Sequence, residues 1–345
     1  MTESSSPRSD RPSREPHLTP GDSLPPVEPP SAAFLVQLFL VPGLIVAIIV
    51  CVWLAFHWLA HLGNDPQAYV RTLRRDNEGR WQAALNLAND LRGPGGAALK
   101  SDETLATELG RILADEAGSG RTGEQSQTLR LYLCRALGEF AIPAAAPPLV
   151  DRIRATSDPQ TARAAVEAVA VLATNLAAAG RRLDDTAAVE SALLEASRSD
   201  DVQLRSAAAF TLGVIGGTAA TQRLVQLCSD DVADVRSNAA LGLARLGSTE
   251  AFEPLGEMLA LPDEPAPTTP ADEVAQSKRY KRALVVVNAL RGVAMLVDAT
   301  HEPPPRNVLD RVAALEKDPV ADVRSSAVAL VRKIERLAAG EKPAP

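Results

Sequence analysis

Carboxylate and guanidinium side chains recur side by side in this sequence, at a spacing that could serve chemistry. The stretch "SDDVADVRSNAALGLARLG" places Asp230 and Asp234 ahead of Arg236. The same pattern returns near the C-terminus at Asp318, Asp322 and Arg324. A carboxylate beside an arginine can transfer protons or bind an anion, but it can equally tie one helix to the next. The choice between these roles depends on whether the pattern occurs once or is repeated.

The four histidines offer a second route to chemistry, through metal or haem binding. His57 and His61 are four residues apart in "HWLAH", which places both imidazoles on one face of a helix. A zinc-protease helix needs a glutamate directly after its first histidine, and Trp58 stands there instead. His17 and His301 lie far from this pair in the sequence. We therefore interpret His57 and His61 as residues at a membrane interface and expect no metal.

Motifs for cofactor binding and covalent catalysis are also weak. The glycine-rich stretches "RGPGG" and "AGSGRTG" follow helical patterns and lack the Lys-Ser/Thr pair of a phosphate-binding loop. The sequence has no Gly-x-Ser-x-Gly elbow. Its three cysteines, Cys51, Cys134 and Cys228, are too scattered for a disulfide framework. We expect reduced thiols that pack as small apolar side chains, and neither a cofactor nor a catalytic residue.

The charge of the chain limits its partners. The formal net charge of −7 disfavours binding to the phosphate backbone of a nucleic acid. The densest basic cluster, "SKRYKR" at residues 277–282, could contact an acidic partner, lipid headgroups or nucleic acid. A solvated helix face is the simpler interpretation, because half of the cluster would lie on different faces of a helix. We expect a protein partner and no nucleic acid.

The N-terminal part of the chain predicts a tail followed by a membrane anchor. Residues 1–31 are rich in Pro and Ser and are predicted to be disordered. Residues 32–63 contain no Asp, Glu, Lys or Arg and are long enough to cross a bilayer as a helix. A cleaved signal peptide is the alternative, but its apolar core is usually about 7 to 15 residues long. We predict a retained single-pass helix, kinked at Pro42, with Trp53 and Trp58 in the interfacial belt.

The basic residues on either side of this span predict its orientation. Arg14 is the one lysine or arginine among the twenty residues before Ala32. The twenty residues after Gly63 contain four, which are Arg71, Arg74, Arg75 and Arg80. Because the more basic flank stays inside, we expect the C-terminal part of this membrane protein to face the cytoplasm.

Residues 64–339 predict helix after helix. Aromatic residues make up 3% of the chain and apolar residues 46%, so a core must consist mainly of Ala, Leu and Val, which suits closely packed helices. Seven segments begin with an arginine and continue as a helix rich in these residues, at Arg80, Arg130, Arg163, Arg205, Arg236, Arg282 and Arg324. Each interval has room for a second, shorter helix. The pattern predicts an all-α solenoid of about seven helix pairs, followed by a disordered C-terminus at residues 340–345.

The repeated motif resembles a known family. The aspartate six residues before Arg236 and Arg324, the "VADVR" that follows it, and prolines in the first helix of some pairs (Pro147, Pro148 and Pro254) resemble the HEAT repeat. The short form seen in phycobilisome lyase relatives is the most similar, and the resemblance covers about residues 66–338. It implies an α-solenoid. It also leaves open a bilin lyase-like enzyme and a HEAT-like DNA glycosylase, although the latter needs a basic, aromatic groove.

Repetition favours a structural role for the aspartates and arginines. A catalytic constellation is needed once, whereas a contact that joins stacked units recurs with every unit. An aspartate before a helix can accept hydrogen bonds from the first amides, and an arginine one turn inside can reach a carboxylate in its own or the adjacent repeat. We expect a membrane-anchored scaffold for protein–protein interaction, without catalysis. The alternative is a bilin lyase-like or other HEAT-fold enzyme.

Overall fold

The computed structural model describes residues 32–61, 66–75, 77, 79–155, 157–263 and 273–339. These residues form helices and contain no strand, which confirms the predicted all-α class. The chain divides into two compact units, Met1–Gly63 and Asn64–Pro345. The predicted disordered segments, residues 1–31 and 340–345, lie outside the described residues.

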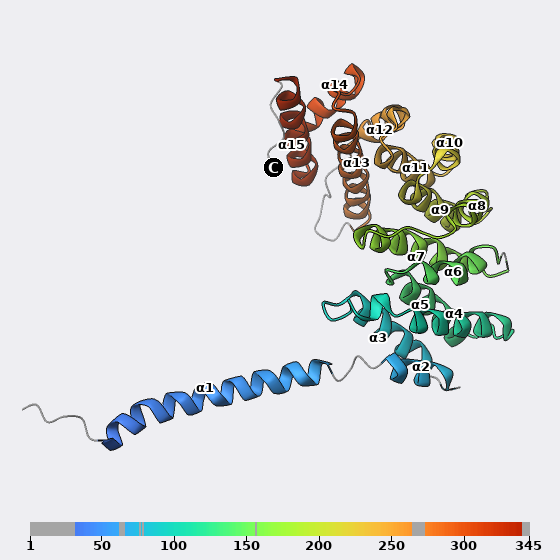
Figure 1. Ribbon diagram of the computed structural model, residues 1–345. Helices are drawn as coiled ribbons and strands as arrows, with labels where there is room; N and C mark the ends of the chain where they lie inside the picture. Colours follow the sequence, from blue (N-terminus) through green and yellow to red (C-terminus); the bar gives the residue numbers. More distant parts are fainter. Residues whose placement is uncertain are drawn as a thin grey trace, which may run out of the picture. The chain divides into compact units, whose positions relative to one another are not determined.

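The described part of the first unit is a single helix, α1 (Ala32–His61), which continues through Pro42 (Figure 1). Its segment Val36–Phe56 is long and apolar enough to cross a membrane, and none of it is buried within the unit. The side chain of Trp53 is 62% exposed. The side chain of Trp58, like those of His57 and His61, lies outside the described residues. Two other helices meet the same length and composition criteria, but both contribute side chains to the core of the second unit.

The second unit, called the repeat array below, is a stack of helix pairs (Figure 1). The first helices are α2 (Pro66–Arg74), α4 (Glu103–Gly118), α6 (Ala146–Ile153), α8 (Thr186–Ala196), α10 (Thr218–Leu227), α12 (Phe252–Leu259) and α14 (Arg306–Ala314). The second helices are α3 (Arg80–Arg92), α5 (Glu124–Gly138), α7 (Pro159–Ala178), α9 (Val202–Ile215), α11 (Ala233–Arg245), α13 (Glu273–Thr300) and α15 (Ala321–Ala338). Among the described residues these make seven pairs, the number that the arginine spacing predicts.

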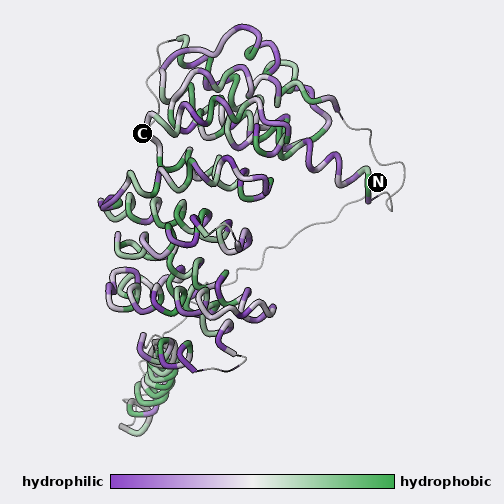
Figure 2. Tube along the Cα trace, turned by 90° about the vertical axis from the view of Figure 1, so that its right-hand side faces the viewer, coloured by the Kyte–Doolittle hydropathy of each residue, from purple (hydrophilic) through white to green (hydrophobic). Residues whose placement is uncertain are grey.

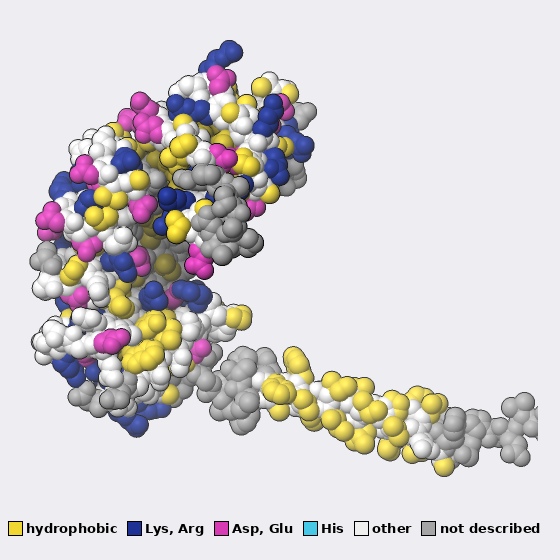
Figure 3. Space-filling view, turned by 180° about the vertical axis from the view of Figure 1, so that it is seen from behind, with side chains coloured by type: hydrophobic (Ala, Val, Ile, Leu, Met, Phe, Trp, Pro, Cys, Tyr) yellow, Lys and Arg dark blue, Asp and Glu magenta, His cyan; other side chains and the backbone are white. Residues whose placement is uncertain are grey.

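The two layers of helices differ in how closely they pack. Each second helix packs extensively on the second helix of the next pair, from α3 through to α15, whereas neighbouring first helices touch more sparsely. The stack therefore curves with the second helices on its inside. We call the exposed side of the second helices the inner face. A space-filling view shows this side of the array hollowed, with Lys and Arg side chains on its wall (Figure 3).

Small side chains allow the second helices to approach one another. The core consists largely of Leu, Ala and Val, and Figure 2 shows hydrophobic residues along the helices where the layers meet. A Cβ atom on Gly213 of α9 would lie 2.4 Å from the Cα atom of Gly242 of α11. The two helices can pack this closely because both positions lack a side chain.

Candidate functional site

The repeated arginines lie on the second helices, and most of them donate a hydrogen bond to the turn that precedes their own helix. Arg236 Nη1 donates to the carbonyl oxygens of Asp230 at 2.6 Å and Asp231 at 3.0 Å. Arg324 Nη1 donates to the carbonyl oxygen of Asp318 at 2.6 Å. Equivalent bonds join Arg80 to Leu73, Arg130 to Arg121, Arg205 to Ser199 and Arg282 to Pro262. These bonds close the loop between the two helices of one pair.

Four of these arginines also reach a carboxylate of the following pair. Arg205 holds Asp230 with two bonds, from Nε at 2.8 Å and from Nη2 at 3.2 Å. Arg282 Nη1 donates to Asp318 at 2.7 Å, and both side chains are buried. The remaining pairs are Arg130 with Asp158 at 3.0 Å and Arg80 with Glu116 at 2.9 Å. Each guanidinium thereby joins its own turn to the next repeat.

The aspartates that pair with Arg205 and Arg282 are not the N-cap residues of the helices that follow them. Asp230 and Asp318 each accept a hydrogen bond from the amide two residues later, at Val232 and Val320, which are themselves the N-cap residues of α11 and α15. Four other aspartates cap helices through their side chains, at Asp102, Asp158, Asp185 and Asp201. Asp234 and Asp322 lie in the first turns of α11 and α15, where a negative charge favours the helix dipole.

Arg163 is placed differently from the other repeated arginines. Its Nε atom is buried without a hydrogen-bond partner, and its nearest carboxylate is Glu167 on its own helix, at 3.6 Å. Among the described residues it reaches neither the preceding turn nor a carboxylate of the next pair. Within the described part of the chain, the contact between repeats made by Arg130 or Arg205 has no counterpart at Arg163.

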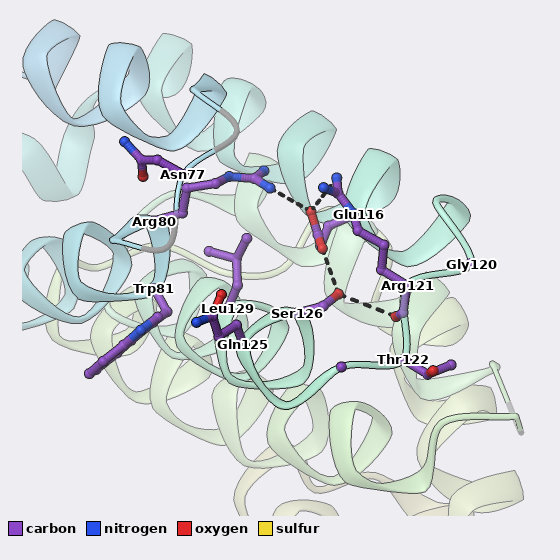
Figure 4. Close-up of a pocket in the computed structure, with 11 residues that line it drawn as sticks. Asn77, Arg80, Trp81, Glu116, Gly120, Arg121, Thr122, Gln125, Ser126 and Leu129 are labelled. Atoms are coloured by element: carbon purple, nitrogen blue, oxygen red, sulfur yellow. Dashed lines mark hydrogen bonds and ion pairs between the residues drawn. The ribbon is translucent and has the colours of Figure 1, made fainter.

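A surface cavity of about 460 Å³ lies where the first two pairs meet (Figure 4). At its wall the carboxylate of Glu116, 2% exposed, accepts bonds from Arg80 at 2.9 Å, Arg121 at 3.1 Å and Ser126 at 2.5 Å. Both carboxylate oxygens are therefore engaged. The arrangement ties α3, α4, the α4–α5 loop and the first turn of α5 together.

The cysteine thiols of the array are poor nucleophiles. Burial raises the pKa of Cys134 to about 12 and the pKa of Cys228 to about 11, so both thiols are protonated near neutral pH. Within the described residues, no group of three or more His, Cys, Asp or Glu side chains is arranged to hold a metal ion.

The inner face also carries aromatic and aliphatic side chains. Phe210 of α9 is 40% exposed, and Leu284 of α13 is 48% exposed. Trp81 of α3 stacks on Tyr132 of α5 with ring centroids 6.1 Å apart. Within "SKRYKR", Arg282 points inward to Asp318, whereas Tyr280 is 70% exposed. A weak signal existed in the sequence for Phe210, which interrupts the Ala-rich stretch "SAAAFTLG".

Similarity to known proteins is found at the level of sequence family and of structure. A model of HEAT repeats matches residues 189–269. This chain contains HEAT-like repeats. One chain in the structure of the complex of CpcE and CpcF of phycocyanin lyase from Nostoc sp. PCC7120 is similar to this chain. The two chains are 20% identical over 78% of this chain and 94% of the matched chain, with a TM-score of 0.47. Human deoxyhypusine hydroxylase in complex with glycerol is similar at 19% identity, over 79% and 96%, with a TM-score of 0.32. No curated protein matches the chain.

Proposed function

We propose that this protein is a membrane-anchored scaffold whose repeat array binds another protein through its inner face. The observation that carries the proposal is the exposed apolar surface on that face, at Val171, Phe210, Tyr280 and Leu284. These side chains lie outside the core of the array, on one face of the second helices, where a partner could bury them. The recurring ion pairs, by contrast, are engaged in holding the repeats to one another.

The proposed anchor is α1. A helix of 30 residues with a fully exposed apolar segment is stable in a bilayer, whereas in water it would leave large apolar side chains exposed. An anchor concentrates the array at the membrane surface and so raises the effective concentration of any membrane-associated partner. This role requires no catalytic group.

The function is tested by in-cell crosslinking and capture of partners with the unmodified chain and two variants of residues 32–63. Replacement of residues 32–63 by an unrelated single span of the same orientation should preserve capture. Deletion of residues 32–63 should weaken capture, because the gain in effective concentration is lost. Capture that needs the original α1 sequence would contradict a simple tether.

Catalysis makes a different prediction. Substitution of individual Asp, Glu, His, Arg and Cys residues of the array by Ala should leave function intact in every variant that folds, because binding over a solenoid surface is spread over many contacts. A folded single variant that retains partner capture but loses all function would favour an enzyme over a scaffold.

A further inference from the structure

Three arginines on the inner face differ from the arginines that hold the repeats together. Arg135 of α5, Arg245 of α11 and Arg291 of α13 are exposed, and none makes a hydrogen bond or ion pair with the described residues. Elsewhere in the array, some exposed arginines, such as Arg92 and Arg111, are paired with carboxylates, whereas Arg182 and Arg306 make no hydrogen bond or ion pair with the described residues. The inner face therefore carries cationic donors that the fold itself does not use.

Two of these guanidinium groups are held against aromatic rings. The guanidinium carbon of Arg135 lies 5.4 Å from the ring centroid of Tyr132, and that of Arg245 lies 5.1 Å from the ring centroid of Phe210. The third, Arg291, lines a groove of about 540 Å³ between α13 and α15. The apolar side chains of Tyr280 and Leu284 share the wall of this groove.

Stacking on a ring favours recognition of a carboxylate. A guanidinium that lies over an aromatic face keeps the N–H donors at its edge available, and their planar fork matches the two oxygens of a carboxylate. The ring also restricts the arginine side chain before any ligand binds, which lowers the entropy lost on binding. Partial desolvation of the Arg245 side chain lowers its pKa.

The charges around these arginines favour an acidic ligand although the whole chain is acidic. Glu167, the exposed carboxylate on the inner face of α7, is paired with Arg163. Asp322 lines the groove between α13 and α15, where Arg279 and Arg291 both lie. Lys281 adds a further exposed cation on α13. Positive charge thus exceeds negative charge at the surface of these helices.

The spacing of the arginines fits an extended chain. Neighbouring packed helices lie about 8–10 Å apart, and an extended chain rises about 3.3 Å per residue. Arg245 and Arg291 lie on adjacent second helices, which corresponds to about three residues of ligand. Arg135 lies three second helices before Arg245, which corresponds to about nine residues. Phe210 and Val171 lie on the helices between them.

We propose that the inner face binds an extended acidic segment of a partner protein. Carboxylates of the segment pair with Arg135, Arg245 and Arg291, and its large apolar side chains pack on Val171, Phe210 and Leu284. This inference rests on the proposed scaffold function and adds to it the chemical class of the partner.

The test uses the full chain in lipid nanodiscs and a labelled synthetic peptide of about 16 residues. The peptide has glutamate at every third position, with leucine, phenylalanine and serine between. Binding is followed by fluorescence anisotropy. The triple variant Arg135→Gln, Arg245→Gln, Arg291→Gln should lower the affinity at least about tenfold, which corresponds to about 1.4 kcal/mol. The same peptide with glutamine for glutamate should bind at least about tenfold more weakly to the unmodified chain.

The matched control is Arg306→Gln, because Arg306 is an exposed arginine on α14 in the outer layer. It should leave peptide affinity unchanged, and the single variant Arg245→Gln gives a second measurement if the triple variant melts early. Unchanged affinity in the triple variant, equal binding of the glutamine peptide, or no binding at about 1 mM peptide would overturn the proposal. Displacement of the peptide by single-stranded RNA at lower concentration would also overturn it, in favour of a nucleic-acid groove.

Failure of this inference is distinguishable from failure of the scaffold function. If partners crosslinked in cells are captured equally by the unmodified chain and the triple variant, the scaffold stands and the acidic ligand is excluded. If the unmodified chain captures no partner in cells, the scaffold itself is excluded, whatever the peptide does.

Discussion

At the residue scale, one arginine in most repeats acts in two directions. Arg205 donates to the carbonyl oxygen of Ser199 in its own turn and holds Asp230 of the next pair with two bonds. Arg236 makes the first type of contact, to Asp230 and Asp231, and no ion pair with the described residues. The repeated arginines therefore contribute unequally to the stability of the array.

This inequality predicts different stability losses on truncation. Arg205→Ala should lower the free energy of unfolding by about 3 kcal/mol, because the mostly buried Asp230 carboxylate loses its partner. Arg236→Ala should lower it by about 1 kcal/mol, the usual value for lost hydrogen bonds to carbonyls. Arg324→Ala should cost less still, since the last repeat has one neighbour. Thermal unfolding followed by circular dichroism measures all three, and equal losses at Arg205 and Arg236 would contradict the two-direction account.

The Asp230 carboxylate also predicts a pH dependence. Burial raises the pKa of Asp230, but hydrogen bonds from Arg205 and from the Val232 amide outweigh burial and hold the pKa below its usual value. A lowered pKa in the folded state means that the stabilisation is complete above the unfolded-state pKa of about 3.9 and is lost as the pH falls through the folded-state pKa.

We therefore expect Asp230→Asn to destabilise the array by about 1–3 kcal/mol at pH 7 and by progressively less below about pH 4. Urea unfolding at a series of pH values tests this expectation. Asp185→Asn is the control, because Asp185 caps α8 without an ion pair among the described residues. A stability difference at Asp230 that stays constant down to about pH 2 would show that its charge is not involved.

At the element scale, the close approach of α9 and α11 depends on two glycines. A methyl group at Gly213 would meet the backbone of Gly242 at 2.4 Å, and backbone cannot move aside as a flexible side chain can. Gly213→Ala should force the two helices apart and lower the free energy of unfolding by about 2 kcal/mol, within the range for overpacked cores. Gly118→Ala is the matched control at the end of α4, where a Cβ atom meets nothing within 4 Å. Equal melting temperatures for the two variants would contradict this packing argument.

The sequence predicts the helices better than it predicts the register in which they pack. The apolar periodicity and the arginine spacing predict the seven pairs, because each second helix must bury the same stripe of small side chains. The register at α7 could not be predicted. Between α9 and α11, the residue eight positions after the first arginine (Gly213, after Arg205) packs against the residue six positions after the second (Gly242, after Arg236). Between α5 and α7, Gly138 lies eight positions after Arg130 and packs against Ala168.

By this relation the arginine position of α7 is Ala162, and Arg163 lies one residue beyond it. A shift of one residue turns a side chain by about 100° around the helix, so Arg163 faces away from the turn that an arginine at position 162 would reach. Loop length decides such shifts, and a loop carries no periodic signal. The stacked pairs on the inner face were missed for a related reason, since Arg245 and Phe210 are far apart in sequence and meet through the stacking of repeats.

At the scale of the whole molecule, each repeat is stabilised by its neighbours, and charged contacts reinforce some junctions more than others. Within the described residues, arginine–carboxylate pairs join the first pair to the second, the second to the third, the fourth to the fifth and the sixth to the seventh. The junction of α7 with α9 relies instead on packing and on the bond from Thr211 to the Val166 carbonyl oxygen. The stability of such a solenoid is approximately the sum of the stabilities of its repeats and of the interfaces between neighbouring repeats.

The proposed location of the array follows from charges that also take part in folding. Arg74 pairs with Glu108, and Arg80 pairs with Glu116 in the folded array. If α1 inserts into a membrane before the array folds, the four arginines after the span act as a topology signal while the chain is still unfolded. The ion pairs of Arg74 and Arg80 in the folded array are compatible with such a signal.

We therefore expect the array to lie on the cytoplasmic side. Protease added to intact cells should leave residues 64–339 undigested, and protease added after lysis should first cut exposed loops, such as residues 181–185 between α7 and α8. Substitution of Arg71, Arg74 and Arg75 by Gln should reduce the charge asymmetry and yield a fraction of molecules with the array outside. Arg306→Gln, Arg332→Gln and Arg336→Gln remove as many charges far from the span and should change nothing. Digestion of the array in intact cells expressing the unmodified chain would reverse the assignment, and with it the choice of the compartment in which a partner is sought.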